Sequence, residues 1–340
     1  MTRITARTGA RLHFGLILSN PADGWEFGGV GLMVDQPGWT LVVQHAIPAP
    51  SSPEHPPEAL DVIHCNSEAT RARLTQLLSR LRSQSLAIPS LDLRVQQQVP
   101  PHTGLGSGTQ LTLACTAAVT WLATGRLPPS AETLAAMSGR SERSAIGTAG
   151  FDCGGFLVDH GRSAPYPRVE RFPVPEHWRF ILVRPHSAEG LSGPAEQDWF
   201  QSRREMPAAL TRTLAALIQQ QLIPAIRADD APRFARALED YGDTTGSFYA
   251  SAQGGTFSHP AIRQLAANLR SAGIHGAAQS SWGPGICIPA GSPEEARQIL
   301  SQIPPEIHGQ PLETTCTTAL NTGALIAREA PEERRNSALA

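Results

Sequence analysis

The chain has 340 residues, with 28 basic and 30 acidic side chains and a formal net charge of −2. This balance produces no overall field that would attract nucleic acid or an anionic membrane, so we expect neither as a partner. The sequence contains no lysine, so all 28 basic residues are arginine. A Schiff-base lysine, a Walker lysine and a lysine general base are therefore excluded.

The five cysteines are scattered without a Cys-x-x-Cys pair, which argues against a zinc site and is typical of reduced thiols in a cytosolic protein. The first 14 residues alternate in polarity and lack the apolar centre of a signal peptide. No apolar run approaches the ~18 residues that a membrane span needs. We therefore expect a cytoplasmic protein.

In the first half of the chain, hydrophobic periodicity predicts several strands and a long helix that follows a glycine-rich loop. Strands are expected at 28–34, 39–45, 91–99 and 154–159, and helices at 68–82, from the glycine loop to Gly125, and at 130–137. In the second half, strands are expected at 179–183, near Ile286 and near Thr314, and helices at 210–222, from Asp230 onward, at 262–269 with Gly273 as its cap, and at 293–303.

Strands and helices mix without regular alternation, so an α+β fold is favoured over a doubly wound sheet. Three prolines in residues 166–175 indicate a domain boundary. We expect an N-terminal domain at 1–172, a C-terminal domain at 173–328 and a disordered polar tail at 329–340.

The loop between the strand at 91–99 and the next helix is the most informative motif. Its core is Gly104, Leu105, Gly106, Ser107, Gly108 and Thr109. The first amides of a helix lack intrahelical acceptors and carry the positive end of the helix dipole, so this arrangement suits a phosphate or diphosphate. The glycine spacing is not that of a Rossmann fingerprint, and no Walker lysine follows. The alternative is a glycine-rich turn with a serine helix cap.

The stretch from Pro101 to Thr109 resembles the phosphate loop of GHMP kinases, P-x-x-x-G-L-G-S-S. Further segments resemble the β-ribofuranosylaminobenzene 5′-phosphate synthases of that superfamily, and the likeness runs from about residue 3 to about 327. These segments are residues 11–16, 28–32, 139–155, 189–193 and 279–284. The resemblance implies a ribosomal-S5-like N-terminal domain, a ferredoxin-like C-terminal domain, a site between them and, as an expectation, a homodimer.

Kinases of this superfamily often carry an S-G-I-D segment whose aspartate acts in phosphoryl transfer. The corresponding residues here are Ser144 to Gly147, so glycine stands where the aspartate is expected. The lysine that many of these kinases use near the N-terminus is also missing. Because phosphoryl transfer needs such groups, this departure argues against a kinase, although a displaced carboxylate would be a substitute.

The synthase resemblance implies a pentosyl transferase of the tetrahydromethanopterin pathway. Such an enzyme joins 5-phosphoribosyl 1-diphosphate to 4-aminobenzoate or 4-hydroxybenzoate and releases diphosphate and carbon dioxide. Mg²⁺ is the expected cofactor, because it would neutralise the leaving diphosphate. ATP is expected only under the second hypothesis, an ATP-dependent small-molecule kinase. The third hypothesis is a non-catalytic ligand-binding homologue.

Basic side chains are candidates for holding anionic groups. Arg140 and Arg143 stand in a loop rich in serine and glycine, where their guanidinium groups suit a phosphate or carboxylate. Arg11 and His13, two residues apart on an expected strand, share one face. Arg11 is a candidate substrate ligand and His13 a proton donor or substrate anchor. His102 lies beside the glycine loop and is a candidate phosphate contact. The alternatives are solvated arginines beside Glu142 for Arg140 and Arg143, a structural histidine for His13, and a loop histidine without a special role for His102.

Acidic and C-terminal residues complete the set of candidates. Asp23 is the candidate metal ligand, and Glu26 and Asp152 are candidates for proton transfer. Glu189 and Ser192 lie in a glycine-rich loop after a strand, a common place for ligand contacts. Gln279, Ser281 and Trp282 resemble the C-terminal motif that closes over the site in GHMP proteins. Trp282 is a candidate wall for an aromatic substrate, with ordinary packing as the alternative.

Overall fold

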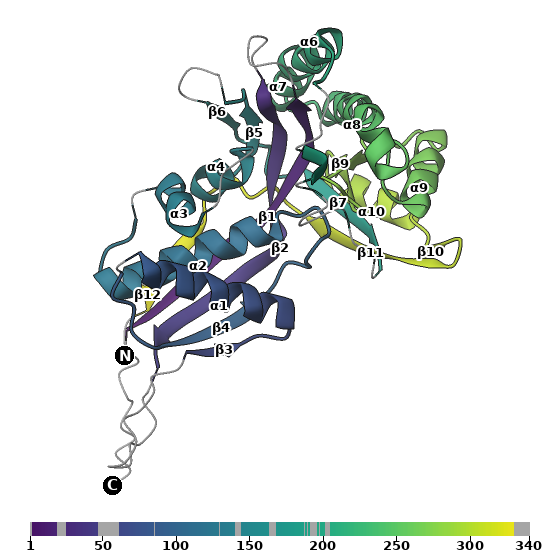
Figure 1. The fold of residues 1–340 in the computed structure, drawn as a ribbon. Coiled ribbons are helices and arrows are strands. Elements are labelled where there is room, and N and C mark those ends of the chain that lie inside the picture. The colour runs from purple at the N-terminus through teal and green to yellow at the C-terminus, as the bar shows by residue number, and fades with distance from the viewer. Residues whose placement is uncertain are drawn as a thin grey trace, which may run out of the picture.

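The structure is a computed structural model that describes residues 2–18, 25–46, 61–84, 86–128, 130–139, 144–162, 168–186, 188, 190, 196, 198–200 and 205–329 (Figure 1). Two sheets and the helices that pack on them make up this part of the chain. The α+β fold class expected from the sequence is confirmed.

The first sheet has seven strands in the order β12-β1-β2-β4-β3, with β5 beside β2 and β6 beside β5. The strands are β1 (Arg3–Leu18), β2 (Glu26–His45), β3 (Val62–His64), β4 (Leu91–Gln97), β5 (Phe156–Asp159), β6 (Val169–Phe172) and β12 (Leu325–Glu329). β1 and β2 are the two long strands in Figure 1 and pair antiparallel along most of their length. The described segments of the N-terminal half that form the candidate site either pack on this pair of strands or follow it in the chain.

The strands expected at 28–34 and 39–45 form one strand, β2. Val34 pairs with Ala10 and Trp39 with Thr8, so residues 35–38 bulge out of the ladder. The bulge has the sequence Asp-Gln-Pro-Gly, which is typical of a turn and includes a proline without an amide donor. The strand resumes because the residues on both sides of the bulge are buried in the same core.

The helices of the first half are α1 (Glu68–Ser83), α2 (Ser107–Thr124), α3 (Ala131–Ser138) and α4 (Ile146–Cys153). The first three were expected, and the left-handed Gly125 ends α2 as predicted. α2 packs against β1, β2, α1, α3 and α4, which explains why most of its residues are buried. α4 was missed, because Gly147 and Gly150 give it low intrinsic helix propensity. Packing against β1, β2 and β5 offsets that deficit.

The second sheet has five antiparallel strands in the order β10-β11-β7-β9-β8. They are β7 (Arg179–Pro185), β8 (Ala278–Gln279), β9 (Ile286–Ala290), β10 (Glu306–Ile307) and β11 (Gln310–Thr317). α9 (Pro260–Ser271) and α10 (Pro293–Ser301) pack on this sheet and enclose a second core. β7, β9, β11, α9 and α10 fall where the periodicity placed them, whereas the two-residue strands β8 and β10 were not expected.

The helix expected at 210–222 is longer than predicted and irregular. It consists of α6 (Ala208–Leu217), a π-helical turn η2 (Ile218–Leu222) and α7 (Ile223–Arg227). The next helix, α8 (Ala231–Gln253), starts after Asp230, whose carboxylate accepts a hydrogen bond from the Arg233 amide at 3.0 Å. α8 contacts β1 of the first sheet and β8 and β9 of the second, and so connects the two layers.

The chain ends on the sheet where it began. β12 pairs antiparallel with β1, with Arg3 opposite Glu329 and Arg7 opposite Leu325. The division at residue 172 stays a prediction, and β12 lies in the sheet of the N-terminal half (Figure 1). Residues 330–340, most of the expected tail, lie outside the described residues. Within the described part, no helix has the length and apolar character needed to cross a membrane.

Candidate active site

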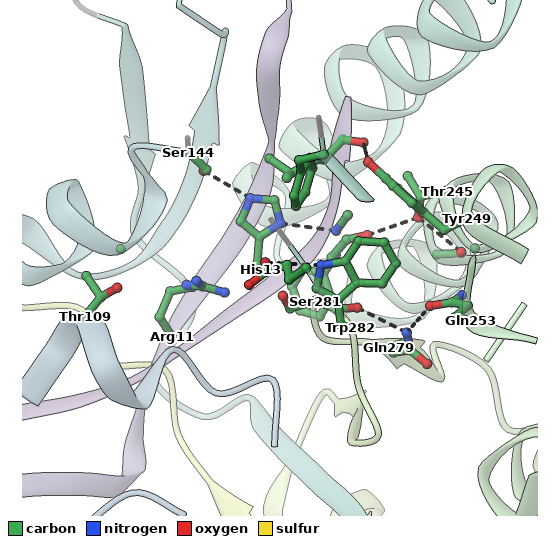
Figure 2. Close-up of a pocket in the computed structure, with 18 of the residues that line it drawn as sticks. Arg11, His13, Thr109, Ser144, Thr245, Tyr249, Gln253, Gln279, Ser281 and Trp282 are labelled. Carbon is green, nitrogen blue, oxygen red and sulfur yellow. Dashed lines mark hydrogen bonds between the residues drawn. The ribbon is translucent and has the colours of Figure 1, made fainter. Parts of the chain in front are cut away.

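A cavity of about 470 Å³ opens where β1, α2, α4 and α8 meet the loop after β8 (Figure 2). Its lining consists of Arg11, His13, Phe14, Gly15, Leu16, Thr109, Gly139, Ser144, Gly147, Thr148, Glu196, Phe200, Gly242, Thr245, Gly246, Tyr249, Gln253, Thr256, Gln279, Ser281 and Trp282. Six of these were predicted site residues: Arg11, His13, Thr109, Gln279, Ser281 and Trp282. Figure 2 shows Arg11 and Thr109 on one side of His13, with Thr245 and Tyr249 on the other.

A bulge in β1 shapes the middle of the cavity. The register with β2 shifts between His13 and Leu16, and Gly15 has a φ of +124°. Hydroxyl groups of α8 bind the carbonyls freed by this bulge: Thr245 donates to Phe14 at 3.1 Å, Tyr241 to Gly15 at 3.2 Å and Tyr249 to Leu16 at 2.8 Å. A Cβ on Gly15 would lie 2.7 Å from Thr245, so only glycine allows this approach.

His13 is buried in the cavity wall and is neutral at physiological pH. Burial, and then the charge of Arg11, lower the pKa of His13 to about 3. Its Nδ1 accepts a hydrogen bond from the Gly15 amide at 3.3 Å, and its Nε2 lies 3.0 Å from the Ser144 hydroxyl. An imidazole with so low a pKa holds no extra proton at neutral pH, and both of its ring nitrogens contact protein groups. The two predicted roles of His13, proton donor and substrate anchor, stay predictions.

Arg11 carries a buried positive charge that the described residues do not satisfy. Its Nε and Nη1 atoms have no hydrogen-bond partner in the structure. Burial lowers its pKa to about 10, and the nearby Glu196 carboxylate partly opposes this effect. Buried polar groups are nearly always hydrogen-bonded, so unsatisfied guanidinium nitrogens in a cavity wall indicate a place for an anion.

The glycine loop lies directly beside Arg11. Gly106 is the N-cap of α2 with a φ of +63°, and no side chain caps this helix end. A Cβ on Gly106 would lie 3.0 Å from both Cβ and Nε of Arg11. The uncapped start of α2 therefore adds its positive polarity beside the Arg11 guanidinium, which lines the cavity. Within the loop only Thr109 lines the cavity itself.

The other loop residues hold the loop against β1 and the second half of the chain. Leu105 packs in the main core, and its carbonyl accepts a hydrogen bond from the Arg11 amide at 3.0 Å. A Cβ on Gly104 would lie 2.2 Å from the Ser280 carbonyl oxygen, while the Ser280 hydroxyl donates to the Gly104 carbonyl at 2.8 Å. The buried Ser107 accepts a hydrogen bond at its carbonyl from the indole of Trp39. Gly104, Leu105 and Ser107 thus have structural contacts.

The opposite end of the cavity is aromatic. Trp282 packs edge to face against Trp199, Phe200 and Tyr249, with ring centroids 5.0, 6.0 and 5.3 Å away. Its indole nitrogen donates to the Glu196 carboxylate at 3.2 Å. Trp282 is packed in an aromatic cluster and also lines the cavity. Ordinary packing and the predicted role as a wall for an aromatic substrate are therefore compatible.

Gln279 and Ser281 lie at the base of this aromatic end. The Gln279 amide donates to Gln253 at 2.9 Å and to the Ser281 carbonyl at 3.1 Å. The Ser281 amide donates to the carbonyl of His13 at 2.6 Å. These bonds attach the loop after β8 to the bulged strand, which places both residues on the cavity wall.

Three predicted residues lie elsewhere. Asp152 accepts two hydrogen bonds of 2.9 Å from the Ala131 amide at the start of α3, and burial raises its pKa. It does not line the cavity, and neither do Glu26 and His102. The Glu26 carbonyl accepts a hydrogen bond from Arg162, and the His102 carbonyl accepts one from Gly190. For Asp152 the geometry favours the structural alternative, whereas the backbone bonds of Glu26 and His102 leave the predicted roles of their side chains as predictions.

Five predicted residues cannot be placed relative to this cavity. Asp23, Arg140, Arg143, Glu189 and Ser192 lie outside the described residues. Their predicted roles stay predictions.

The structure adds cavity residues that the sequence alone did not indicate. They are Ser144, Glu196, Thr245, Tyr249 and Gln253. Asp159 lies directly behind Ser144, and its carboxylate accepts a hydrogen bond from the Ser144 hydroxyl at 3.2 Å. Its position at the end of an expected strand was the only signal for Asp159, and the residues on α8 gave none.

The carboxylates that the structure describes offer few ligands for a magnesium ion. Within this part of the chain, no group of three or more histidine, cysteine, aspartate or glutamate residues could hold a metal ion. Glu196 is the carboxylate on the described cavity lining. Mg²⁺ bound to a diphosphate needs only one or two protein carboxylates, because phosphate oxygens and water fill its other positions. The described residues therefore fit a magnesium ion that enters with its substrate and do not form a cage for a resident metal.

Known proteins with a matching domain and the same fold indicate the class to which this chain is similar. Residues 72–158, which run from α1 through the glycine loop to β5, match the GHMP kinases N terminal domain family. The whole fold resembles those of solved proteins that include a kinase and a decarboxylase. Homoserine kinase from Cytophaga hutchinsonii superposes with a TM-score of 0.62 at 16% identity, covering 96% of this chain and 97% of that one. Mevalonate diphosphate decarboxylase from Staphylococcus aureus gives 0.60 at 13% identity, covering 96% and 98%.

Within this class, the chain is similar in sequence to β-ribofuranosylphenol 5′-phosphate synthases. It is 29% identical to the protein of that name from Methanothermobacter thermautotrophicus over 294 residues, which are 82% of this chain and 86% of the relative. It is also 29% identical to the one from Archaeoglobus fulgidus, over 68% of this chain and 73% of that relative. The resemblance noted from the motifs is confirmed at the level of a GHMP domain with synthase-like relatives.

Proposed function

We propose that the protein is a pentosyl transferase that joins 5-phosphoribosyl 1-diphosphate to 4-hydroxybenzoate and releases diphosphate and carbon dioxide. The name of the relatives describes a phenol that bears a ribofuranosyl 5′-phosphate. Loss of carbon dioxide from 4-hydroxybenzoate leaves a phenol, whereas 4-aminobenzoate would leave an aniline. 4-Hydroxybenzoate is therefore the preferred acceptor, and 4-aminobenzoate is the alternative.

The observation that carries the proposal is the unsatisfied guanidinium of Arg11 at one end of a cavity whose other end is aromatic. The Arg11 end, with the uncapped start of α2, suits a phosphate or diphosphate. The wall formed by Phe200, Tyr249 and Trp282 suits a benzoate ring. A cavity of about 470 Å³ is within the usual range for small-molecule sites.

The position of Gly147 argues against phosphoryl transfer. Gly147 lines the cavity at the place where the kinase aspartate is expected, and a Cβ there would lie 3.2 Å from Thr109 and 3.8 Å from Arg11 Nε. The Arg11 guanidinium therefore lies near the position at which these kinases carry the aspartate carboxylate. Since the chain has no lysine either, the described site lacks both groups that the kinases of this superfamily use.

The proposed reaction balances without an added oxidant or reductant. The bond between sugar C1 and the diphosphate oxygen breaks, and its electron pair leaves with diphosphate. The ring carbon that carries the carboxylate forms the new bond to C1. The bond to the carboxylate then breaks, and its electron pair restores the aromatic ring as carbon dioxide leaves.

In this reaction Arg11 and the α2 amides would bind the anionic group that departs or its magnesium complex. The aromatic wall would orient the ring and exclude water, which would otherwise capture the positively charged sugar carbon. Mg²⁺ would supply further charge neutralisation at the diphosphate.

The test is an incubation of the protein with Mg²⁺, 5-phosphoribosyl 1-diphosphate and carboxyl-labelled 4-hydroxybenzoate. We expect diphosphate and labelled carbon dioxide in equal amounts. A reaction without the aromatic acid is the control, because simple hydrolysis releases diphosphate but no carbon dioxide. Parallel reactions with 4-aminobenzoate measure the preference between the acceptors by kcat/KM.

Other outcomes would reject the proposal. Formation of ADP from ATP with a small alcohol, without carbon dioxide release from the benzoate, would establish a kinase. Binding of the phosphosugar without any turnover, under conditions in which a known synthase is active, would establish a non-catalytic ligand-binding protein.

A further inference from the structure

A chain of three side chains leads from the cavity wall into the interior. His13 Nε2 lies 3.0 Å from the Ser144 hydroxyl, and the Ser144 hydroxyl lies 3.2 Å from Oδ2 of Asp159. His13 comes from β1, Ser144 precedes α4, and Asp159 ends β5. Figure 2 shows the first of these contacts, between the His13 ring and Ser144.

The direction of the hydrogen bonds is fixed by the backbone. The amide of Gly15 can only donate, so His13 Nδ1 must be the acceptor of that bond. The proton of the neutral ring is therefore on Nε2, which donates to the Ser144 hydroxyl. Ser144 also accepts from the Ile146 amide at 3.2 Å, which leaves its own proton for Asp159.

The end of this chain is a buried and fully paired carboxylate. Asp159 is 0% exposed and accepts hydrogen bonds from Arg168 Nε at 2.8 Å and Nη2 at 3.1 Å. The amides of Ala145 and Gly161 add bonds of 2.7 and 3.0 Å. An ionised carboxylate only accepts, so Ser144 has to donate toward it and cannot reverse the direction of the chain.

From this geometry we infer that Ser144 and Asp159 are positioning residues that hold the His13 ring where the Gly15 amide reaches Nδ1, so that the neutral ring carries its proton on Nε2. The chemical purpose of this arrangement rests on the proposed function. A neutral imidazole adds no positive charge beside a sugar carbon that becomes positive, and a fixed ring orientation keeps one tautomer. Arg168 is the counter-ion of the buried Asp159.

Two variants break the chain at different bonds. Ser144→Ala removes the acceptor of the Nε2 proton and leaves the pair between Asp159 and Arg168 intact. Asp159→Asn places an amide that can donate toward Ser144. We expect each change to lower kcat on the order of 10- to 100-fold with little change in KM, as for other partners that orient a functional histidine. Ser144→Thr retains a hydroxyl, and we expect it to restore most of the activity.

Asp61→Asn is the matched control. Asp61 forms a similar two-bond pair with Arg82, at 2.6 and 2.7 Å, and it does not line the cavity. This variant loses an aspartate–arginine pair of the same kind, and we expect its kcat to equal that of the parent protein.

A second readout does not depend on turnover. In protein labelled with ¹⁵N-histidine, the His13 signals are identified by their loss in His13→Gln. We expect an unprotonated Nδ1 in the parent protein. In Ser144→Ala the ring loses the contact that holds it against the Gly15 amide, so we expect it to turn away and show a mixture of tautomers. If His13 keeps one tautomer and kcat is unchanged in Ser144→Ala, the inference is wrong. If the tautomer shifts but no transferase activity exists in the parent, the inference stands and the proposed function fails.

Discussion

At the scale of single residues, Arg11 is the cavity residue whose charged side chain costs free energy to bury. Burial of this guanidinium without a full set of partners lowers its pKa to about 10, which corresponds to roughly 3 kcal/mol disfavouring the charged form. This cost has a purpose if the charge binds an anion, as proposed for this site.

We therefore expect Arg11→Met to weaken binding of 5-phosphoribosyl 1-diphosphate at least tenfold without lowering the melting temperature. The methionine fills similar space and removes a buried charge that lacks partners. Calorimetric titration and thermal unfolding measure the two quantities. Unchanged affinity combined with a lower melting temperature would mean that Arg11 is a structural residue.

His13 gives a prediction about pH. Its pKa of about 3 lies below the usual 6.5, so between these values the unfolded state binds more protons than the folded state. Stability therefore falls as the pH decreases from 6.5 toward 3. At pH 5 the contribution of this residue is a loss of about 2 kcal/mol relative to pH 7.

Urea unfolding of the parent protein and His13→Gln at pH 5 and pH 7 measures this contribution. Glutamine has no titrating group, so the difference in unfolding free energy between the two pH values should be smaller in the variant by about 2 kcal/mol. Equal differences in both proteins would show that the ring is not held in its neutral form.

At the scale of elements, the proposed anion site depends on the start of α2, which no side chain caps. Gly106 is in the left-handed region and faces the Arg11 side chain. Asparagine and aspartate both tolerate this backbone conformation better than other residues with side chains. The two substitutions therefore introduce nearly the same shape and differ in charge.

Gly106→Asp should abolish binding of the phosphosugar, because its carboxylate would pair with Arg11 and repel the ligand. Gly106→Asn is the control and should bind more weakly than the parent but at least tenfold more tightly than the aspartate variant. Equal affinities for the two variants, measured by titration calorimetry, would show that the start of α2 is not the anion site.

Two helices, α2 and α4, also show which kind of element the sequence predicts and which kind it does not. α2 was predictable because its apolar residues and Gly125 act within one helix. α4 was not, because a helix with Gly147 and Gly150 is stabilised by contacts with β1 and β2, which are distant in sequence, as well as with β5, which follows it. The position of Asp152 outside the cavity was not predictable either, since its partner is the start of α3 and no local pattern reveals that contact.

At the scale of the whole molecule, elements of both layers line the cavity. β1 and α2 belong to the first sheet and its helices, whereas the loop after β8 belongs to the second, and α8 contacts both. A ligand in the cavity should therefore stabilise the two layers together. Ligand binding at 100 times Kd contributes about 2.7 kcal/mol to the folded state.

We expect 5-phosphoribosyl 1-diphosphate with Mg²⁺ to raise the melting temperature by about 5 °C in a single transition, and ATP with Mg²⁺ to have little effect. Differential scanning calorimetry with each ligand is the measurement. Stabilisation by ATP and none by the phosphosugar would favour the kinase alternative.

The features that depend on neighbours along the chain could be predicted from the amino-acid sequence. They are most helices and strands and the pair Arg11 and His13 on one strand face, whereas the glycine loop as an anion site stays a prediction. Tertiary structure alone decided which candidates meet in one cavity and which serve as caps. It also placed Ser144, Asp159 and the α8 hydroxyls beside His13, although these residues are separated from it by more than a hundred positions. Such contacts depend on burial and packing between distant elements, which a single sequence does not encode in any local period.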